Sequence, residues 1–403
     1  MTTRARLAIV TTHPVQYHAP WFRALARQPE LDLTVFYCHR ATPEQQAAAG
    51  FGVPFDWDVP LLDGYCYRFL KNVAPSTYSG SFRGLDTPEI REITAGRQFD
   101  AILVNGWHYK SAWQAIVSCW RNRIPLMLRG DSHLHTQRSL LKRYLKYPVY
   151  KGFIPRADAC LAAGTWSREY FLYYGARPED IFPVPHAIDE QWFAAELKRW
   201  LPLRAELRRH WTVEPGAMVA LFAGKFIEKK RPLDFVRAVA EAKRRGALVA
   251  GLMVGDGALR AQCEALTAET GAPIRFAGFL NQSQMVSAYV AADVLVLPSD
   301  GRETWGLVVN EAMACGRPAI VSDAVGCGPD LLLAGKTGDR FPLGNVEALA
   351  DLLVSYVERP EMCRAMAQAA RERLAAFSLD AAVQGIMRAV EAIVVRKSRV
   401  KES

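Results

Sequence analysis

The sequence predicts an α/β protein with more than one domain, and three observations support this. The chain has 403 residues, which is too many for one ordinary domain core. Short apolar runs recur along it, each ended by a polar loop and often followed by a segment of helical periodicity, as in parallel sheets. Half of the residues are hydrophobic and the mean hydropathy is −0.03, which is ordinary for a globular protein.

One strand–loop–helix–strand segment contains the clearest site signal. Val294–Leu297 and Pro318–Val321 suit buried strands, and Gly306–Cys315 has the apolar spacing of a helix. The first amides of that helix lack internal partners and lie at the positive end of its dipole, so we expect an anion site there. Glu303 precedes the helix and Glu311 lies roughly 7 Å along it. A phosphate held between two carboxylates matches the layout of a nucleotide sugar.

The segment from Glu303 to Glu311, followed by Ala-Met-Ala-Cys-Gly-Arg-Pro at 312–318, resembles the signature of retaining glycosyltransferases of family 4. That resemblance implies the GT-B fold, an α/β architecture in which two Rossmann-like domains face each other across a cleft. It also implies that Glu303 contacts the donor sugar, that Glu311 contacts the ribose and that intervening amides hold the phosphate. The implied donor-binding residues are Glu303, Thr304, Trp305, Gly306, Leu307 and Glu311. Taken alone, the spacing also fits two solvated helix charges.

The resemblance covers nearly the whole chain and implies three parts. Residues 1–182 would form an N-terminal, acceptor-side Rossmann-like domain. Residues 183–376 would form the nucleotide-sugar-binding domain, and 377–403 a C-terminal helix that crosses back to the first domain. The proline-rich passage Arg177–Asp189 marks the boundary.

Two lysines follow the first strand of the second domain, Met218–Ala223. In the family, an arginine or lysine directly after a glycine and a lysine five residues on neutralise the donor diphosphate. Lys225 and Lys230 match these positions, although an ammonium group lacks the bidentate fork of the commoner arginine. A solvated basic turn is the alternative. The loop that contacts the base in the family matches Gly278–Leu280, which makes Phe279 a donor-binding candidate.

Polar loops after the strands of the first domain supply the other candidates. Gln16, Tyr17 and His18 lie in the loop HPVQYHAP, which resembles a variant of a family loop that more often holds paired glycines. These three residues and His108 are the predicted acceptor contacts, and a structural turn is the alternative. Open α/β sheets bind ligands at this edge.

The loop after Ile124–Leu128 matches the place where family members put a polar residue near the reacting carbon of the donor sugar. Asp131 is the nearest match and His133 the second. His133 and His135 have no obvious third ligand, so we do not predict a metal site.

Two segments have compositions typical of surfaces or cleft walls. Phe51–Leu70 is aromatic and could line an acceptor cleft, but packing under a long loop is the favoured interpretation. The segment 138–156 has six basic residues and no acidic one, interleaved with leucine and tyrosine. Contact with an anionic membrane is one interpretation. A solvated helix whose leucines face the core is the one we favour.

Charge and cysteine usage limit the partners and the location. The net charge of +9 suits anionic partners, and no nucleic-acid-binding motif accompanies it. Eight cysteines without paired-ligand spacing predict reduced thiols in the cytoplasm rather than disulfides or a zinc site. No apolar run reaches the ~18 residues that a membrane-spanning helix needs. The expected location is therefore cytoplasmic, and peripheral at the inner membrane face if the basic segment binds lipid.

The predicted function is retaining transfer of a sugar from a nucleotide sugar, UDP- or GDP-linked, to an acceptor hydroxyl. The acceptor classes are polysaccharide, lipopolysaccharide, glycolipid and secondary metabolite. Lysines and amides would stabilise charge on the leaving diphosphate, so no metal or other cofactor is expected. The candidate catalytic residues are Lys225, Lys230, Glu303, Asp131 and His133. The alternatives are a GT-B nucleotide-sugar epimerase and a non-enzymatic nucleotide or polyanion binder.

Overall fold

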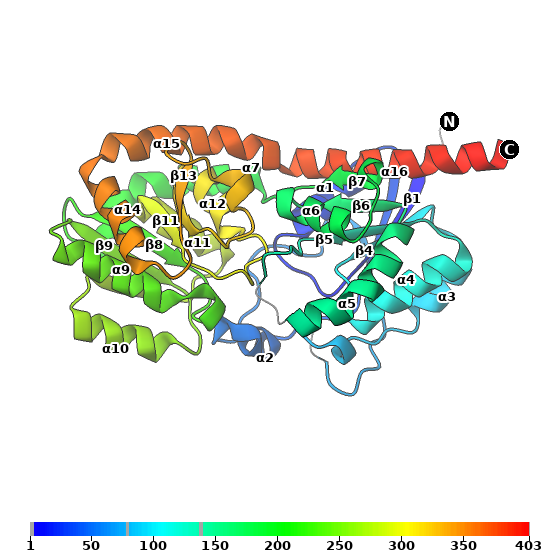
Figure 1. Cartoon of the computed structure of the whole chain (residues 1–403), viewed down its shortest axis with the longest axis horizontal. Helices are drawn as coiled ribbons and strands as arrows, with labels where there is room; N and C mark the ends of the chain where they lie inside the picture. Colours follow the sequence, from blue (N-terminus) through cyan, green and yellow to red (C-terminus); the bar gives the residue numbers. More distant parts are fainter. Residues whose placement is uncertain (1–3, 78–79, 137–139, 403) are drawn as a thin grey trace.

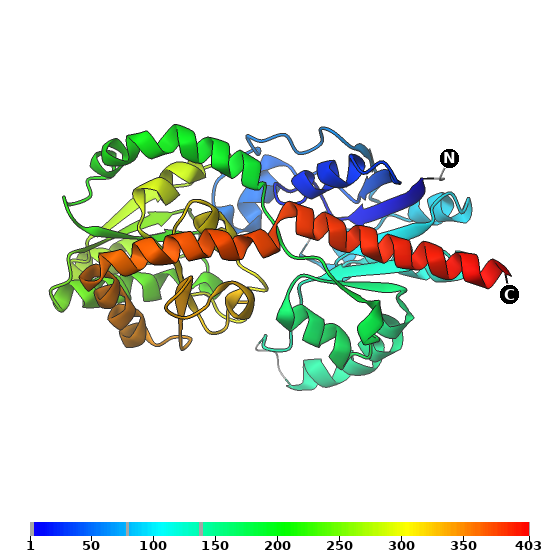
Figure 2. The ribbon, with the colours of Figure 1, turned by 90° about the horizontal axis from the view of Figure 1, so that it is seen from above.

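The computed structural model of the chain describes residues 4–77, 80–136 and 140–402, without the side chains of 140–143 and 397–402. These residues form two parallel sheets that lie side by side along the long axis, each with helices on both faces (Figures 1 and 2). The predicted α/β class is confirmed. We call residues 4–183 the first lobe and residues 190–374 the second lobe.

The sheet of the first lobe has the order β3-β2-β1-β4-β5-β6-β7, and every neighbouring pair is parallel. Its strands are β1 (Ala5–Thr11), β2 (Leu31–Tyr37), β3 (Cys66–Phe69), β4 (Ala101–Asn105), β5 (Leu126–Gly130), β6 (Ala159–Ala162) and β7 (Ile181–Pro183). Its helices are α1 (Ala19–Ala26), α2 (Pro43–Gln46), α3 (Ile90–Ala95), α4 (Lys110–Asn122), α5 (Leu140–Phe153) and α6 (Thr165–Tyr173). Sequence patterning missed β3 because this edge strand is mostly exposed and has no buried apolar run.

The sheet of the second lobe has the order β10-β9-β8-β11-β12-β13 and is also parallel. Its strands are β8 (Met218–Ala223), β9 (Val249–Val254), β10 (Ile274–Gly278), β11 (Val294–Leu297), β12 (Ala319–Ser322) and β13 (Gly338–Phe341). The helices of this part are α7 (Glu190–Trp200), α8 (Arg204–His210), α9 (Pro232–Arg244), α10 (Arg260–Thr270), α11 (Gln282–Ala291), α12 (Val308–Ala314), α13 (Gly328–Leu331), α14 (Val346–Glu358), α15 (Pro360–Leu374) and α16 (Leu379–Glu402).

The strand order reverses direction at one place in each sheet, between β1 and β4 in the first and between β8 and β11 in the second. The strands beside these points are almost entirely buried, because apolar side chains cover both of their faces. Loops at the carboxyl ends of strands diverge at such a point and leave a crevice. The loops after β1, β4, β8 and β11 carry predicted site residues. Each of these loops therefore starts beside such a crevice.

The final helix joins the two lobes. α15 and α16 follow each other along one side of the molecule, and α16 continues over the first lobe (Figures 1 and 2). Ala382, Val383 and Ile386 are buried in the same apolar core as residues of β1 and β2. Gly385 allows this approach, since a Cβ there would lie 2.0 Å from the carbonyl oxygen of Pro183. Among the described residues, no helix is long and apolar enough to span a bilayer.

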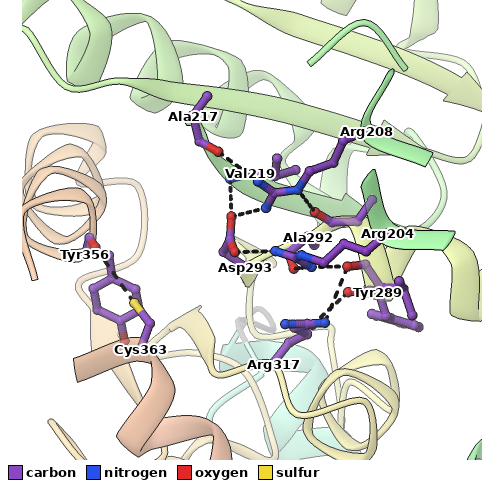
Figure 3. Close-up of polar contacts among 12 residues, drawn as sticks. Arg204, Arg208, Ala217, Val219, Tyr289, Ala292, Asp293, Arg317, Tyr356 and Cys363 are labelled. Carbon is purple, nitrogen blue, oxygen red and sulfur yellow. Dashed lines mark hydrogen bonds and ion pairs between the residues drawn. The ribbon is translucent and has the colours of Figure 1, made fainter. Parts of the chain in front are cut away.

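Asp293, just before β11, anchors α8 and the sheet of the second lobe (Figure 3). Its carboxylate accepts a hydrogen bond of 2.6 Å from Arg204, another from Arg208, and one of 2.8 Å from a backbone amide of β8. Nearby, Arg317 Nε donates to the carbonyl oxygen of Tyr289 at 2.9 Å. This bond ties α11 to the loop after α12, the helix that carries the predicted ribose contact.

Helix α5 departs from the favoured prediction. Leu145 is 62% exposed and Tyr144 is 79% exposed, so the expectation that the leucines face the core is wrong for Leu145. Proline occupies position 148 inside this helix. Of the basic segment, Arg138 lies outside the described residues, and nothing is described of the side chains at 140–143.

Candidate active site

A cavity of about 470 Å³ lies between the two lobes, and both contribute to its walls. Its size is in the range of small-ligand sites. The loops after β1, β5, β8 and β11 all reach it. Of the predicted site residues, the structure places Gln16, Tyr17, Asp131, Lys225, Lys230, Phe279, Glu303, Thr304, Trp305, Gly306, Leu307 and Glu311 in the cavity wall.

Lys230 and Glu303 form an ion pair in this wall, and each side chain is only 11% exposed. The loop after β8 supplies the ammonium and the loop after β11 the carboxylate. Burial by itself disfavours the charged carboxylate, but Lys230 and then Lys229, 4.0 Å away, hold the pKa of Glu303 below its usual value. The carboxylate is therefore ionised and fixed at neutral pH.

Lys225 lies near this pair, with its Nζ donating to the carbonyl oxygen of Ala49 at 2.7 Å. Within the described part of the chain, no carboxylate oxygen comes within 4.0 Å of this ammonium. Burial, followed by repulsion from Lys229 and Lys230, lowers the pKa of Lys225 to about 8. A partly buried cation without an acidic partner favours an anion beside it.

The start of α12 lies in the wall of the same cavity, where Gly306, Leu307 and Val308 line it. Leu307 is the N-cap residue and no side chain caps this end. Gly306 precedes it with a φ of +99°, where a Cβ would lie 2.8 Å from Leu297 Cδ2. Only glycine fits this turn without strain. A helix start without a side-chain cap and two lysines thus line one cavity, an arrangement that suits a diphosphate.

Glu311 lies one turn into α12 and is held by two tyrosine hydroxyl groups. Tyr289, on α11, donates to it at 2.6 Å, and Tyr17, from the loop after β1, donates at 3.0 Å. Burial raises the pKa of Glu311, although these hydrogen bonds oppose the shift. The contact with Tyr17 joins the first lobe to the second at the carboxylate predicted to hold the ribose.

Asp131 of the first lobe and Thr304 of the second lobe meet in the cavity wall. Thr304 Oγ1 donates to Asp131 at 2.7 Å, and His186 Nε2 lies 3.6 Å from the same carboxylate. Arg129 is within 3.4 Å of His186 Nδ1, so this nitrogen accepts and Nε2 carries the proton toward Asp131. Burial opposes ionisation of Asp131, but His186, Thr304 and Arg129 together hold the pKa of its carboxyl well below the usual range.

Three predicted residues lie outside the cavity wall. His18 is packed against Trp21 with a nitrogen 3.5 Å from Asn105. His108 is exposed, and His133 is buried with its ring 5.0 Å from that of Trp166. Their proposed contacts with sugar or acceptor stay predictions.

Several wall residues were not among the predicted site residues. His186, Asp256 and Gln282 were missed, and Phe51 and Trp57 lie in the stretch Phe51–Leu70, for which lining a cleft was the less favoured interpretation. His186 lies in the proline-rich passage, where a histidine has no distinctive spacing. The aromatic composition around Phe51 was a usable signal. The favoured interpretation of that stretch, packing under a loop, does not describe Phe51 and Trp57, which line the cavity.

Within the described residues, no group of three or more His, Cys, Asp or Glu side chains is placed to hold a metal ion. The expectation of no cofactor stays a prediction.

Two family models match the chain. One is described as glycosyl transferases group 1 and matches residues 204–373, and the other is glycosyltransferase family 4 and matches residues 16–192. Together they span both lobes, and the cavity between the lobes holds the signature glutamates and lysines. The chain belongs to glycosyltransferase family 4.

Two relatives agree with membership of family 4. A GDP-mannose-dependent alpha-(1-6)-phosphatidylinositol dimannoside mannosyltransferase of Mycobacterium tuberculosis is 30% identical over 59% of this chain and 58% of its own length. A D-inositol 3-phosphate glycosyltransferase of Saccharomonospora viridis is 33% identical over 51% of this chain and 48% of its own. The chain thus matches only about half the length of these relatives.

Among solved structures, Anabaena HepE in complex with UDP and glucose superposes with a TM-score of 0.70 at 16% identity, covering 96% of this chain and all of that one. Sucrose-phosphate synthase from Thermosynechococcus elongatus gives 0.70 at 20% identity, covering 99% and 100%. At this identity the likeness shows the fold alone, and it confirms the predicted GT-B architecture.

Proposed function

We propose that this protein transfers a sugar from a nucleotide sugar to an acceptor hydroxyl with retention at the anomeric carbon. One observation supports this above all others. The uncapped start of α12, the ammonium of Lys225, which has no carboxylate partner among the described residues, and the ion pair of Lys230 with Glu303 line the same cavity between the lobes. This set of positive groups suits a diphosphate, and the carboxylates of Glu303 and Glu311 flank it on both sides.

The cavity suggests an orientation for the donor. The ribose would lie at Glu311, the diphosphate at the two lysines and the helix start, and the sugar toward Asp131 and Thr304. As the bond from the anomeric carbon to the diphosphate breaks, negative charge grows on the leaving oxygens. Lysines and amides already in place stabilise this charge without reorganisation, so the proposed reaction needs no metal. Residues 1–182 would serve the acceptor, 183–376 the donor, and 377–403 would join the two.

The names of similar proteins suggest which nucleotide the donor carries. The mycobacterial relative is named as GDP-mannose-dependent, and HepE was solved with UDP. We therefore propose a UDP- or GDP-linked donor and a carbohydrate or lipid-linked acceptor. The eight cysteines are free thiols, which suits a cytoplasmic location.

A thermal-shift panel of UDP, GDP and ADP tests the donor site. A nucleotide at 100 times its Kd stabilises the protein by about 2.7 kcal/mol. A panel in which none of them stabilises the protein contradicts the proposal. Incubation with the matching nucleotide sugar then distinguishes a transferase from an epimerase. A transferase releases nucleoside diphosphate when acceptor is present, whereas an epimerase isomerises the sugar of the donor without any acceptor. Binding without either reaction indicates a non-enzymatic binder.

We also propose that α5 makes peripheral contact with anionic membrane. Tyr144 and Leu145 project into solvent beside Lys146 and Lys151, a combination that suits an acidic lipid surface. Co-sedimentation with vesicles should require phosphatidylserine or phosphatidylglycerol and should fall in the double variant Lys146→Gln, Lys151→Gln. Lys336 is exposed on the second lobe, so Lys336→Gln is the matched control. Binding to neutral vesicles alone, or no binding, contradicts membrane contact.

A further inference from the structure

A segment of the first lobe crosses to the second lobe at the donor cavity. We call residues 47–58, between α2 and β3, the strap. Three residues of the second lobe hold it by hydrogen bonds. Asn281 Nδ2 donates to the carbonyl oxygen of Asp56 at 2.7 Å, and Lys225 Nζ donates to the carbonyl oxygen of Ala49. The amide of Ser283 donates to Asp58 at 3.2 Å, and its hydroxyl donates to the same carboxylate. Figure 1 shows α2, immediately before the strap, at the junction of the lobes.

The strap fits closely against the loop after β9. Gly52 has a φ of +79°, and a Cβ there would lie 3.0 Å from Asp256 Oδ1 and 3.1 Å from the amide of Gly257. Glycine therefore permits both the backbone conformation and the close approach. Asp256 itself lines the donor cavity, so this contact places the strap at the cavity rather than elsewhere on the second lobe.

Three aromatic rings of the strap gather around Phe279. The ring of Phe55 lies 4.4 Å from that of Phe279, and Phe51 and Trp57 each lie 4.9 Å from Phe55. Phe51, Trp57 and Phe279 line the cavity, while Phe55 packs behind them. Every nucleobase has an apolar face that stacks on such rings.

One end of this aromatic wall adjoins the cation for the proposed diphosphate. Lys225 Nζ lies 3.9 Å from the ring centre of Phe51. A nucleoside diphosphate whose phosphates reach Lys225 would therefore have its base within reach of the strap. The indole N–H of Trp57 is buried without an acceptor among the described residues.

We propose that Phe51 and Trp57 of the strap, together with Phe279, form the nucleobase subsite, so that the first lobe completes the donor site. This inference rests on the proposed function, because it assumes a nucleoside diphosphate in the cavity. It assigns donor binding to residues of the lobe expected to serve the acceptor. Nucleotide binding would then hold the two lobes together.

Calorimetry with UDP, GDP and ADP, and with inorganic pyrophosphate as a probe without a base, tests the assignment. Trp57→Ala and Phe51→Ala should each lower the affinity for the best-binding nucleotide by about fivefold or more, as expected when a stacking ring is removed. Affinity for pyrophosphate should stay within about twofold of wild type. Asp58→Ala removes the contact between the strap and Ser283 without changing a ring, and it should also lower the affinity for the nucleotide. Phe82→Ala, 51% exposed and outside the cavity wall, is the control.

Nucleotide affinity that is unchanged in both ring variants overturns the subsite. An equal loss for nucleotide and pyrophosphate overturns it as well, because the rings would then act on the cavity as a whole. Melting temperatures identify a variant that has failed to fold, in which case Asp58→Ala decides. A wild-type protein that binds none of the three nucleotides refutes the proposed function, and the subsite with it.

Discussion

Replacing Lys230 by alanine separates the structural role of this side chain from its proposed role in catalysis. Its ammonium neutralises Glu303, and both side chains are 11% exposed. Removing one partner of a buried pair costs about 3–5 kcal/mol, because the other charge stays buried. Lys229 remains 4.0 Å from Glu303 and the cavity admits water, so we expect a loss of about 2 kcal/mol in the free energy of unfolding.

The same change should affect turnover more strongly. Lys230 would stabilise charge that grows on the leaving diphosphate, and removal of one such contact lowers turnover by about 10²-fold or more. Nucleoside diphosphate release from the donor measures turnover, calorimetry measures affinity, and urea unfolding measures stability. The double variant Lys230→Ala, Glu303→Gln is the control for stability. It removes the orphaned carboxylate charge, so it should recover most of the stability and none of the turnover.

Either of two results would refute this reasoning. A Lys230→Ala protein with wild-type nucleotide affinity and most of its turnover has no phosphate contact at this position. A double variant that regains turnover along with stability would mean that Lys230 acts only by neutralising Glu303.

Three further predictions follow from single side chains. Burial and neighbouring lysines lower the pKa of Lys225 to about 8, so its ammonium is charged below that pH. The affinity for nucleoside diphosphate, measured by calorimetry, should therefore fall as the pH rises from 7.5 to 9. Lys225→Arg should abolish this fall, because the guanidinium stays charged over the whole range. A pH-independent wild type contradicts this. Gly306→Ala should lower the free energy of unfolding by about 1–3 kcal/mol and weaken nucleotide binding, because φ is +99° and the added Cβ would meet Leu297. Gly96 has open space around it, so Gly96→Ala should change neither measurement. Asp293→Ala should lower the unfolding free energy by about 2–3 kcal/mol in urea, because two arginines lose their carboxylate partner, and should leave nucleotide affinity unchanged; altered affinity would mean that this network reaches the cavity.

Much of the donor site is encoded over short distances along the chain. Lys225 and Lys230 lie in the same connection between β8 and α9, and Glu303 and Glu311 are separated by the end of one loop and one helical turn. Once the apolar strands before them are recognised, parallel packing brings both loops to the same edge of the sheet. Motif spacing, together with the resemblance to family 4, was therefore enough to predict this group, and the structure brings all four residues to one cavity.

The contacts between the lobes could not be predicted in this way. Tyr17 meets Glu311, Asp131 meets Thr304, and the strap reaches Phe279, across separations of more than 170 residues. Hydrophobic periodicity reports which face of an element is buried but not which distant loop covers it. The exposure of Leu145 shows the same limit, since its spacing fits a core position and only the packing around α5 places it in solvent.

The sequence by itself determined two parallel α/β sheets and the positions of lysines, glutamates and a helix start along one of them, because local spacing and apolar runs fix these. Only the tertiary structure decided which side chains of the two lobes meet at the cavity, because that depends on how α16 and the linker between β7 and α7 set the two lobes against each other.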